Sequence, residues 1–213
     1  DINSTNCLAS AYSATNDSDN IALNFRELGS GNCEFRVVGY NNNFRITNRL
    51  FRDTSAWYHI VVAFDTTQSS ADDRIKVYVN GVQETSFSTS GNVTQNMNIA
   101  FNDTSVHRIG VQSNAFSNYM DGYMAEVYFA DGQSYAPTTF AEEDTNGVWI
   151  PKEAKDDITF GTNGYYLEFK QTGTSANSSG IGADTSGNDH HFTVGNMTAI
   201  DITTDTPTNN FAT

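Results

Sequence analysis

Residues 74–83, with the sequence RIKVYVNGVQ, constrain the fold more than any other part of the chain. Three branched apolar residues alternate with polar ones, which predicts a strand with one buried face. Asn80 and Gly81 then supply the two positive φ angles that a type I′ turn requires. The chain must reverse at this point, so the segment predicts a β-hairpin.

The rest of the sequence has the same pattern, in which short apolar or alternating segments are separated by residues that favour tight turns. No stretch longer than a turn or two repeats at helical spacing, and turns rich in Asn, Ser and Gly separate the apolar runs. The sequence therefore predicts an all-β protein. The predicted strands are residues 6–12, 20–28, 33–38, 44–51, 57–65, 74–80, 82–88, 106–113, 121–130, 164–170 and 190–195. Within them, residues 60–64 are apolar on both faces, which predicts a strand in the middle of a sheet covered on both sides or in the interior of a sandwich.

A chain of 213 residues fits one large domain better than two full ones. We predict a single antiparallel two-sheet β-sandwich of jelly-roll type over residues 1–200. Residues 136–163 form a long connection in this interpretation, with a short helix start after Pro137. Residues 164–195 supply closing strands, because an open sandwich leaves unpaired backbone groups at its edge. Residues 201–213 are predicted to be an extended tail or a linker.

The charge balance restricts the partners. Twenty-five acidic residues face 11 basic ones, for a net charge of −14. This excess repels nucleic acid and anionic lipid, so neither is an expected partner. No run of 18 apolar residues predicts a membrane span. Because Asp1 is not an initiator residue, we expect a processed chain or a fragment.

Two cysteines, Cys7 and Cys33, allow one disulfide. They lie on the predicted first and third strands of a meander, about 10 Å apart. A disulfide requires Cα atoms within about 7 Å. We interpret both as small core residues, with the bridge as an open alternative.

Three segments together resemble the laminin-G-like, concanavalin-A-like β-sandwich family. They are AWYHIVVAFD at residues 56–65, IKVYVNG at residues 75–81, and YMDGYMAEVYF at residues 119–129, which follows Arg108-Ile-Gly. Their order and spacing match the family over about residues 20–130. The resemblance implies a sandwich fold, and it implies that the family's first strand and Phe-x-Trp motif are missing before Asp1.

The C-terminal part is similar to a recurrent architecture in structural proteins of tailed bacteriophages. The matching segments are residues 144–151, 164–169, 184–189, 192–194 and 205–211. This resemblance implies a non-catalytic module on the virion surface, outside the cell, on a tail fibre, spike or capsid exterior. The implied partners are other virion proteins and a bacterial surface glycan, and a homo-oligomer is expected. The alternative is a purely architectural decoration protein that acts through protein contacts.

A polysaccharide hydrolase is the third interpretation, because sandwiches of this family also carry glucanases. Retaining hydrolysis requires two carboxylates about 5 Å apart. The nearest candidate is Glu142-Glu143-Asp144, which falls on the predicted helix start and lacks a third acid. A charge cluster at a helix terminus is the simpler interpretation, so we predict that the protein is not an enzyme.

One loop has the composition of a calcium site. Asp184, Ser186 and Asn188 alternate around Gly187, and Ca²⁺ takes six to eight oxygen ligands. Similar Asp-x-Ser-Gly-Asn loops in the family hold Ca²⁺, so Ca²⁺ is the candidate cofactor. The alternative is an Asx turn that satisfies its own backbone.

Two loops combine aromatic rings, which stack on the C–H faces of sugars, with short amides. One holds Tyr40 and Asn42, within the run Asn41-Asn42-Asn43. The other holds the remaining candidate ligand-binding residues. These are Asn114, Phe116, Asn118, Tyr119 and Asp121. Turn chemistry with packing aromatics is the alternative for both loops.

Overall fold

The computed structural model describes residues 4–13, 16, 19–91, 93–113, 116–204 and 206–207. Within these residues the chain forms thirteen strands, five single-turn 3-10 helices and no α-helix, which confirms the all-β prediction. No helix in the described part is long and apolar enough to cross a bilayer. The strands are β1 (Asn6–Tyr12), β2 (Asn20–Glu27), β3 (Cys33–Val38), β4 (Asn43–Phe51), β5 (Ile60–Phe64), β6 (Ile75–Val79), β7 (Val82–Gln83), β8 (Phe87–Ser90), β9 (Val106–Ile109), β10 (Val127–Phe129), β11 (Ala141–Glu143), β12 (Trp149–Pro151) and β13 (Tyr165–Leu167). The 3-10 turns are η1 (Ala71–Asp73), η2 (Ala100–Asn102), η3 (Pro137–Thr139), η4 (Lys155–Asp157) and η5 (Ala199–Asp201).

The chain divides into two compact units, Asp1–Gly122 and Tyr123–Thr213. This differs from the single domain over residues 1–200 that the sequence predicts. The difference arises because β13 pairs with β10, inside the second unit, and does not extend the large sheet of the first.

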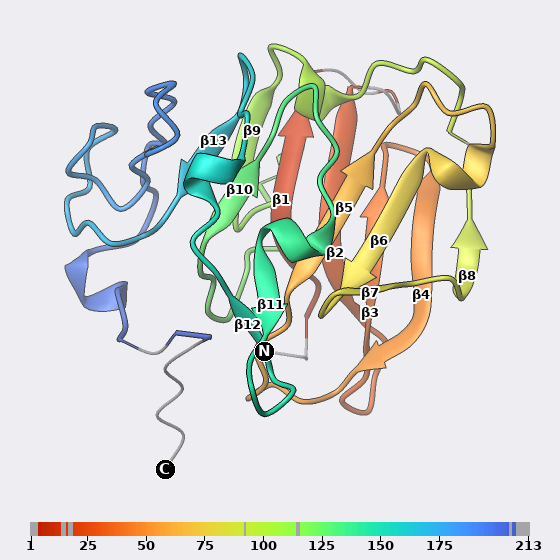
Figure 1. Cartoon of the computed structure of the whole chain (residues 1–213), viewed down its shortest axis with the longest axis horizontal. Coiled ribbons are helices and arrows are strands. Elements are labelled where there is room, and N and C mark those ends of the chain that lie inside the picture. The colour runs from red at the N-terminus through yellow and green to blue at the C-terminus, as the bar shows by residue number, and fades with distance from the viewer. Residues whose placement is uncertain are drawn as a thin grey trace. The chain divides into compact units, whose positions relative to one another are not determined.

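The first unit is a sandwich of two antiparallel sheets. One sheet has six strands in the order β8-β4-β3-β2-β1-β9, and the other has three in the order β5-β6-β7. Figure 1 shows the three-stranded sheet in front of the six-stranded one. Phe35 and Val37 of β3 and Val77 of β6 are fully buried in the core. Alternation along these strands places one apolar row of each sheet in the interior.

The predicted hairpin is present between β6 and β7. Val79 pairs with Val82, and the turn residues Asn80 and Gly81 have φ angles of 48° and 79°. Positive φ at both positions is the geometry of the predicted turn. The local sequence was sufficient here because the turn type depends on these two residues alone.

Of the two positions predicted for β5, the middle of a sheet is wrong. This strand lies at the edge of the three-stranded sheet, hydrogen-bonded to β6, and its side chains are half-buried. An apolar run indicates that both faces avoid water, but it does not determine how many strands pair with it. The sequence therefore identified the strand and misplaced it in the sheet.

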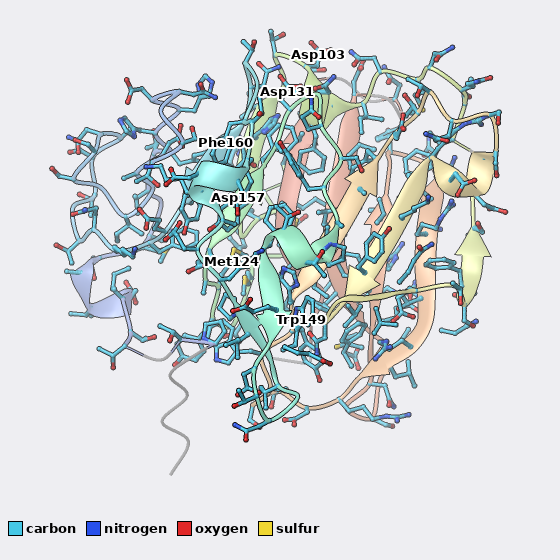
Figure 2. All side chains as sticks on the ribbon, in the orientation of Figure 1. Asp103, Met124, Asp131, Trp149, Asp157 and Phe160 are labelled. Carbon is cyan, nitrogen blue, oxygen red and sulfur yellow. The ribbon has the colours of Figure 1, made fainter. Side chains whose placement is uncertain are left out.

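The second unit contains two small strand pairs, β10 with β13 and β11 with β12. Its core gathers Ala154, Ile158, Phe160 and Tyr166. Phe160, labelled in Figure 2, accepts a hydrogen bond at its carbonyl from the Asp131 backbone N–H at 2.8 Å. These contacts give the unit its own hydrophobic core.

Two predictions for the second unit are corrected. The expected helix start after Pro137 is the single turn η3, and the next residues form strand β11 because their backbone pairs with β12. Residues 190–195 do not form a strand. The His190 N–H donates to the Asp184 carboxylate instead of to a neighbouring strand. Of the predicted tail, residues 205 and 208–213 lie outside the described residues.

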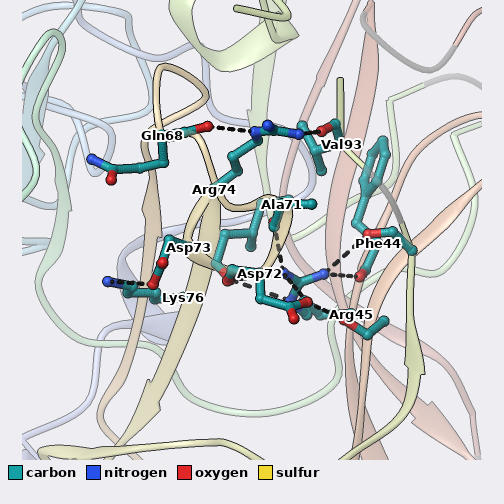
Figure 3. A network of polar contacts seen from close by, with 12 residues as sticks. Phe44, Arg45, Gln68, Ala71, Asp72, Asp73, Arg74, Lys76 and Val93 are labelled. Atoms are coloured by element: carbon teal, nitrogen blue, oxygen red, sulfur yellow. Dashed lines mark hydrogen bonds and ion pairs between the residues drawn. The ribbon is translucent and has the colours of Figure 1, made fainter. Parts of the chain in front are cut away.

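Two buried arginines join loops to the sheets of the first unit (Figure 3). Arg45 on β4 is 2% exposed, and its guanidinium donates to five backbone carbonyls. Those acceptors are the carbonyls of Phe44, Ala71, Asp72, Ile75 and Gly91, at 2.8–3.4 Å. Arg74 donates in the same way to the carbonyls of Gln68, Ser69 and Val93. Because the Arg45 bond to Ile75 crosses from β4 to β6, this side chain links the two sheets.

Cys7 and Cys33 are buried and are not joined in a disulfide. Cys7 packs against Ala22 and Val38, and burial raises the pKa of its thiol to about 12. The interpretation of both residues as small buried side chains is confirmed.

We therefore expect neither thiol to react with a thiol-specific reagent such as DTNB in the native protein, because the thiolate is the nucleophile and neither sulfur is accessible. Both should react in concentrated guanidinium chloride, and a reducing agent should leave the melting temperature unchanged. A melting temperature that falls on reduction would contradict this prediction.

Candidate functional site

The strand register gives the six-stranded sheet two faces of different character. The face with Phe35 and Arg45 points into the sandwich. On the opposite face, Asn24 of β2 pairs with Arg36 of β3, and Arg26 pairs with Glu34. Ser10 of β1 pairs with Arg108 of β9 on the same side. We call this surface the polar face. Its polar members are Asn20, Asn24, Arg26, Glu34, Arg36 and Arg108.

The six strands concentrate positive charge in an acidic protein. Five of the chain's 11 basic residues lie in them, against two of its 25 acidic residues. The basic residues are Arg26, Arg36, Arg45, Arg49 and Arg108, and the acidic ones are Glu27 and Glu34. The local charge of the sheet is therefore opposite in sign to that of the whole chain.

Several polar atoms on this face are buried without a hydrogen-bond partner. They are Asn20 Nδ2, Asn24 Oδ1, Arg26 Nε, Arg36 Nε and Glu34 Oε1, the last of which lies 2.7 Å from Arg26 Nη2 in an ion pair. Asn24 is only 3% exposed. A buried polar group left unpaired costs about 1–3 kcal/mol, and such groups are rare in folded proteins. The four atoms without an ion pair therefore have hydrogen-bonding capacity that the protein does not use.

The arginines of the face are held by their terminal nitrogens. Arg26 Nη2 forms an ion pair with Glu34 Oε1 at 2.7 Å, and Arg36 Nη2 donates to Asn43 Oδ1 at 2.7 Å. Burial and the positive charge of Arg26 lower the pKa of Arg36, an effect that Glu34 opposes. The crowding of two cations makes this part of the face favourable for a negative group.

One edge of the polar face carries an exposed aromatic ring. The Arg108 guanidinium lies 4.4 Å from the centre of the Phe116 ring, in cation–π geometry. Arg108 Nη1 also donates to Ser113 Oγ at 2.7 Å. Phe116 is 59% exposed, and its left-handed backbone (φ 46°) places it at the tip of the turn after β9. The ring is therefore oriented by the protein and still accessible.

The structure separates the residues that the sequence grouped as ligand-binding candidates. Phe116 and Tyr119 are exposed, while Asn118 is used within the turn, where its Nδ2 donates to Gln112 Oε1. The Asp121 backbone N–H donates to Asn6 Oδ1, and Asn114 lies outside the described residues.

The second candidate loop lies elsewhere on the sheet. Tyr40, which is exposed, and Asn42 connect β3 to β4. The β3 strand is three strand positions away from β9, a separation of about 14 Å. The two loops therefore flank the polar face and do not form one site.

Sequence reasoning missed the polar face itself. Its signal is present in residues 20–26, where Asn20, Asn24 and Arg26 alternate with Ile21, Leu23 and Phe25. The alternation predicts a polar side of the strand. It does not reveal that Arg36 and Glu34 lie opposite, because that depends on the register.

The predicted calcium ligands lie in one loop, where the Asp184 carboxylate and the Asn188 amide already form hydrogen bonds within the protein. Asp184 Oδ1 accepts the N–H groups of Tyr166 and Ser186, and Oδ2 accepts Ser186 Oγ–H and the His190 N–H. Asn188 Nδ2 donates to two backbone carbonyls of the same unit. The four hydrogen bonds occupy the single carboxylate, which is the Asx-turn alternative. No cluster of three or more His, Cys, Asp or Glu that could hold a metal occurs among the described residues. Calcium binding stays a prediction for titration.

Several acidic residues of the second unit are candidates for the pair of carboxylates that a polysaccharide hydrolase requires. Glu142 and Glu143 are neighbours on β11, so they point to opposite faces and cannot act as a pair. Glu126 and Glu168 flank the pair Val127–Leu167 of β10 and β13, an arrangement that the sequence did not suggest. Glu168 is already ion-paired with Lys170. Burial, followed by the charge of Glu153, raises the pKa of Glu126.

Comparison with known proteins adds one finding. A laminin-G family model with the description "Concanavalin A-like lectin/glucanases superfamily" matches residues 2–136. No curated protein and no solved structure matches the chain.

Proposed function

The chain belongs to the concanavalin A-like lectin/glucanase superfamily, and from this premise we propose that it is a non-catalytic carbohydrate-binding module. The observation that carries the proposal is the set of buried, unpartnered polar atoms on the polar face, above all Asn24 Oδ1 and Asn20 Nδ2. Sugar hydroxyls both donate and accept hydrogen bonds, so they can pair with a side-chain amide in either direction.

Two exposed rings that follow β9 extend the proposed binding surface at one edge of the polar face. They are Phe116 and Tyr119, whereas Tyr40 follows β3, three strand positions away, and is not part of this surface. An aromatic ring offers apolar area to the C–H face of a sugar and loses little conformational freedom on binding. The polar face would then hold the hydroxyl groups.

A glycan array, probed with and without EDTA, tests the proposal. We expect binding to at least one class of glycan, unchanged by EDTA because the Asp184 carboxylate is already occupied by hydrogen bonds. A blank array, together with assembly of the protein onto purified particles, would instead support the architectural decoration role.

Replacing Phe116 by alanine is expected to weaken glycan binding about fivefold, because it removes the ring and its contact with Arg108. The measurement is isothermal titration calorimetry with the best ligand from the array. The matched control is Val82→Ala, which truncates an exposed side chain of the three-stranded sheet. Equal weakening in both variants would contradict a role for the Phe116 ring.

The proposed setting is the exterior of a bacteriophage particle, on a fibre, spike or capsid. The support is the resemblance of residues 144–211 to modules of tailed-phage structural proteins. We propose other virion proteins and a host-surface glycan as partners, and a homo-oligomer as the assembly. Light scattering of the purified protein and binding to purified particles test these points.

A polysaccharide hydrolase is the second candidate, favoured by the placement of Glu126 and Glu168 beside the β10–β13 pair. Release of reducing sugar from β-glucans, abolished by Glu168→Gln, would establish it. The ion pair of Glu168 with Lys170 favours the ionised carboxylate, which suits a nucleophile or base and not a general acid.

A further inference from the structure

We infer that the polar face takes an acidic glycan and binds its carboxylate or sulfate group with Arg26 and Arg36. This inference rests on the proposed carbohydrate-binding function and adds the chemical class of the ligand.

Charge is distributed unevenly between the six strands and the rest of the chain. Outside the six strands, the chain carries six basic residues against 23 acidic ones, whereas the strands themselves hold five basic and two acidic residues. The polar face has three arginines and a single glutamate. The net negative charge of the chain repels an anionic polymer. The arginines of the polar face attract it, so the charge pattern favours binding of an acidic glycan at the polar face.

The two guanidinium groups of Arg26 and Arg36 are close neighbours with unused hydrogen-bond donors. Arg26 and Arg36 lie on adjacent strands and on the same face, within reach of the same carboxylate, Glu34. Each uses a terminal nitrogen for a contact inside the protein, and each keeps its Nε without a partner. Guanidinium N–H groups bind planar carboxylates and sulfates through paired hydrogen bonds. Both Nε atoms are buried, so an anion first meets the exposed part of the face, where the Arg26 side chain is 40% exposed.

The acid that the described strands place on the polar face, Glu34, is already neutralised. Glu34 is ion-paired with Arg26, and its side chain is 8% exposed. Arg36 instead donates a hydrogen bond to the amide oxygen of Asn43 and interacts with Glu34 through charge alone. An anionic group beside Arg36 also reduces its repulsion with Arg26.

The experiment is an array on which each carboxylated or sulfated glycan is printed beside its methyl-esterified or desulfated analogue. We expect the acidic member of a pair to bind about tenfold more tightly than the neutral one. Binding to carboxylated or to sulfated glycans alone supports the inference and identifies the anionic group. Equal binding of both members overturns the inference and leaves carbohydrate binding intact, whereas no binding to any sugar overturns both.

Two variants of equal charge test the location. Arg36→Gln should weaken binding of the acidic glycan about tenfold, with the neutral analogue unaffected. Arg52→Gln makes the same change in net charge at an exposed arginine outside the six strands, and it should stay within about twofold of the wild type. Melting temperatures check that both variants fold, and Arg26→Gln provides a second variant of the face.

Two outcomes would show that the polar face does not bind the acidic group. Equal losses in Arg36→Gln and Arg52→Gln would mean that net charge, not the polar face, controls binding, which overturns the inference. Poly-glutamate is a control for non-specific attraction to polyanions. Binding of poly-glutamate as tightly as the acidic glycan would overturn the inference as well.

Discussion

Replacing Arg45 by methionine is expected to destabilise the first unit by about 4 kcal/mol, with a fall in melting temperature of about 10 °C. The arginine is 2% exposed and donates to five backbone carbonyls. Methionine fills much of the same volume but donates no hydrogen bond. The carbonyls of the β4–β6 contact and of the η1 turn would then be buried without partners, and that loss accounts for most of the effect. Urea unfolding followed by tryptophan fluorescence and circular dichroism measures it.

Two further variants separate the hydrogen bonds from the charge. Arg45→Lys keeps the positive charge but concentrates three donors on one nitrogen, so we expect an intermediate loss of stability. Arg52→Met is the control, because Arg52 is exposed and its bond to Asn32 Oδ1 lies at the surface. It should change the free energy of unfolding by less than about 0.5 kcal/mol. An unchanged stability of Arg45→Met would mean that water replaces the guanidinium at all five carbonyls.

The contrast between the β6–β7 hairpin and Arg45 shows what the sequence could predict. The hairpin depends on residues next to one another, and the Asn80-Gly81 pair specifies its turn. The burial of Arg45 depends on carbonyls from residues 71, 72, 75 and 91, which the fold brings together from distant parts of the chain. The sequence around Arg45, with Phe44 and Ile46 as neighbours, does not predict these carbonyl acceptors.

The same reason explains the outcome for the candidate site. The exposed aromatic residues were predictable as single positions, because Phe116 and Tyr119 lie in a polar loop after a strand. The polar face was not, because its members come from three different strands and meet only in the observed register. The position of β5 in its sheet was mispredicted for a related reason, because the hydrophobicity of a segment indicates its burial and does not indicate which strands pair with it.

For the loop around Asp184, the sequence left two alternatives open, calcium binding and an Asx turn. In the structure, the carboxylate accepts four hydrogen bonds from Tyr166, Ser186 and His190. Burial alone raises the pKa of the Asp184 carboxyl, but these four bonds outweigh burial and hold the pKa below its usual range. Hydrogen bonding of the ionised form is the physical cause. The loop therefore depends on a charged carboxylate for its shape.

Asp184→Asn is accordingly expected to destabilise the second unit by about 3 kcal/mol, because the new amide turns a donor toward Ser186 and the His190 N–H. A lowered pKa contributes stability that is present above the unfolded-state pKa of about 4 and is lost as the pH falls through the folded-state value. The difference in stability between wild type and Asp184→Asn should therefore be full at neutral pH and should shrink below about pH 4.

The matched control for this variant is Asp189→Asn in the same loop. The Asp189 side chain is 87% exposed and lies 3.8 Å from His191 Nε2, so its loss should leave stability within about 0.5 kcal/mol of the wild type. Thermal unfolding with added CaCl₂ or with EDTA distinguishes the two roles of Asp184. If hydrogen bonds occupy the carboxylate, Ca²⁺ leaves the melting temperature of the wild type unchanged, and Asp184→Asn is equally destabilised in both solutions. A melting temperature that rises with Ca²⁺ in the wild type and not in Asp184→Asn would establish the calcium site and contradict the Asx turn as the native state of the loop.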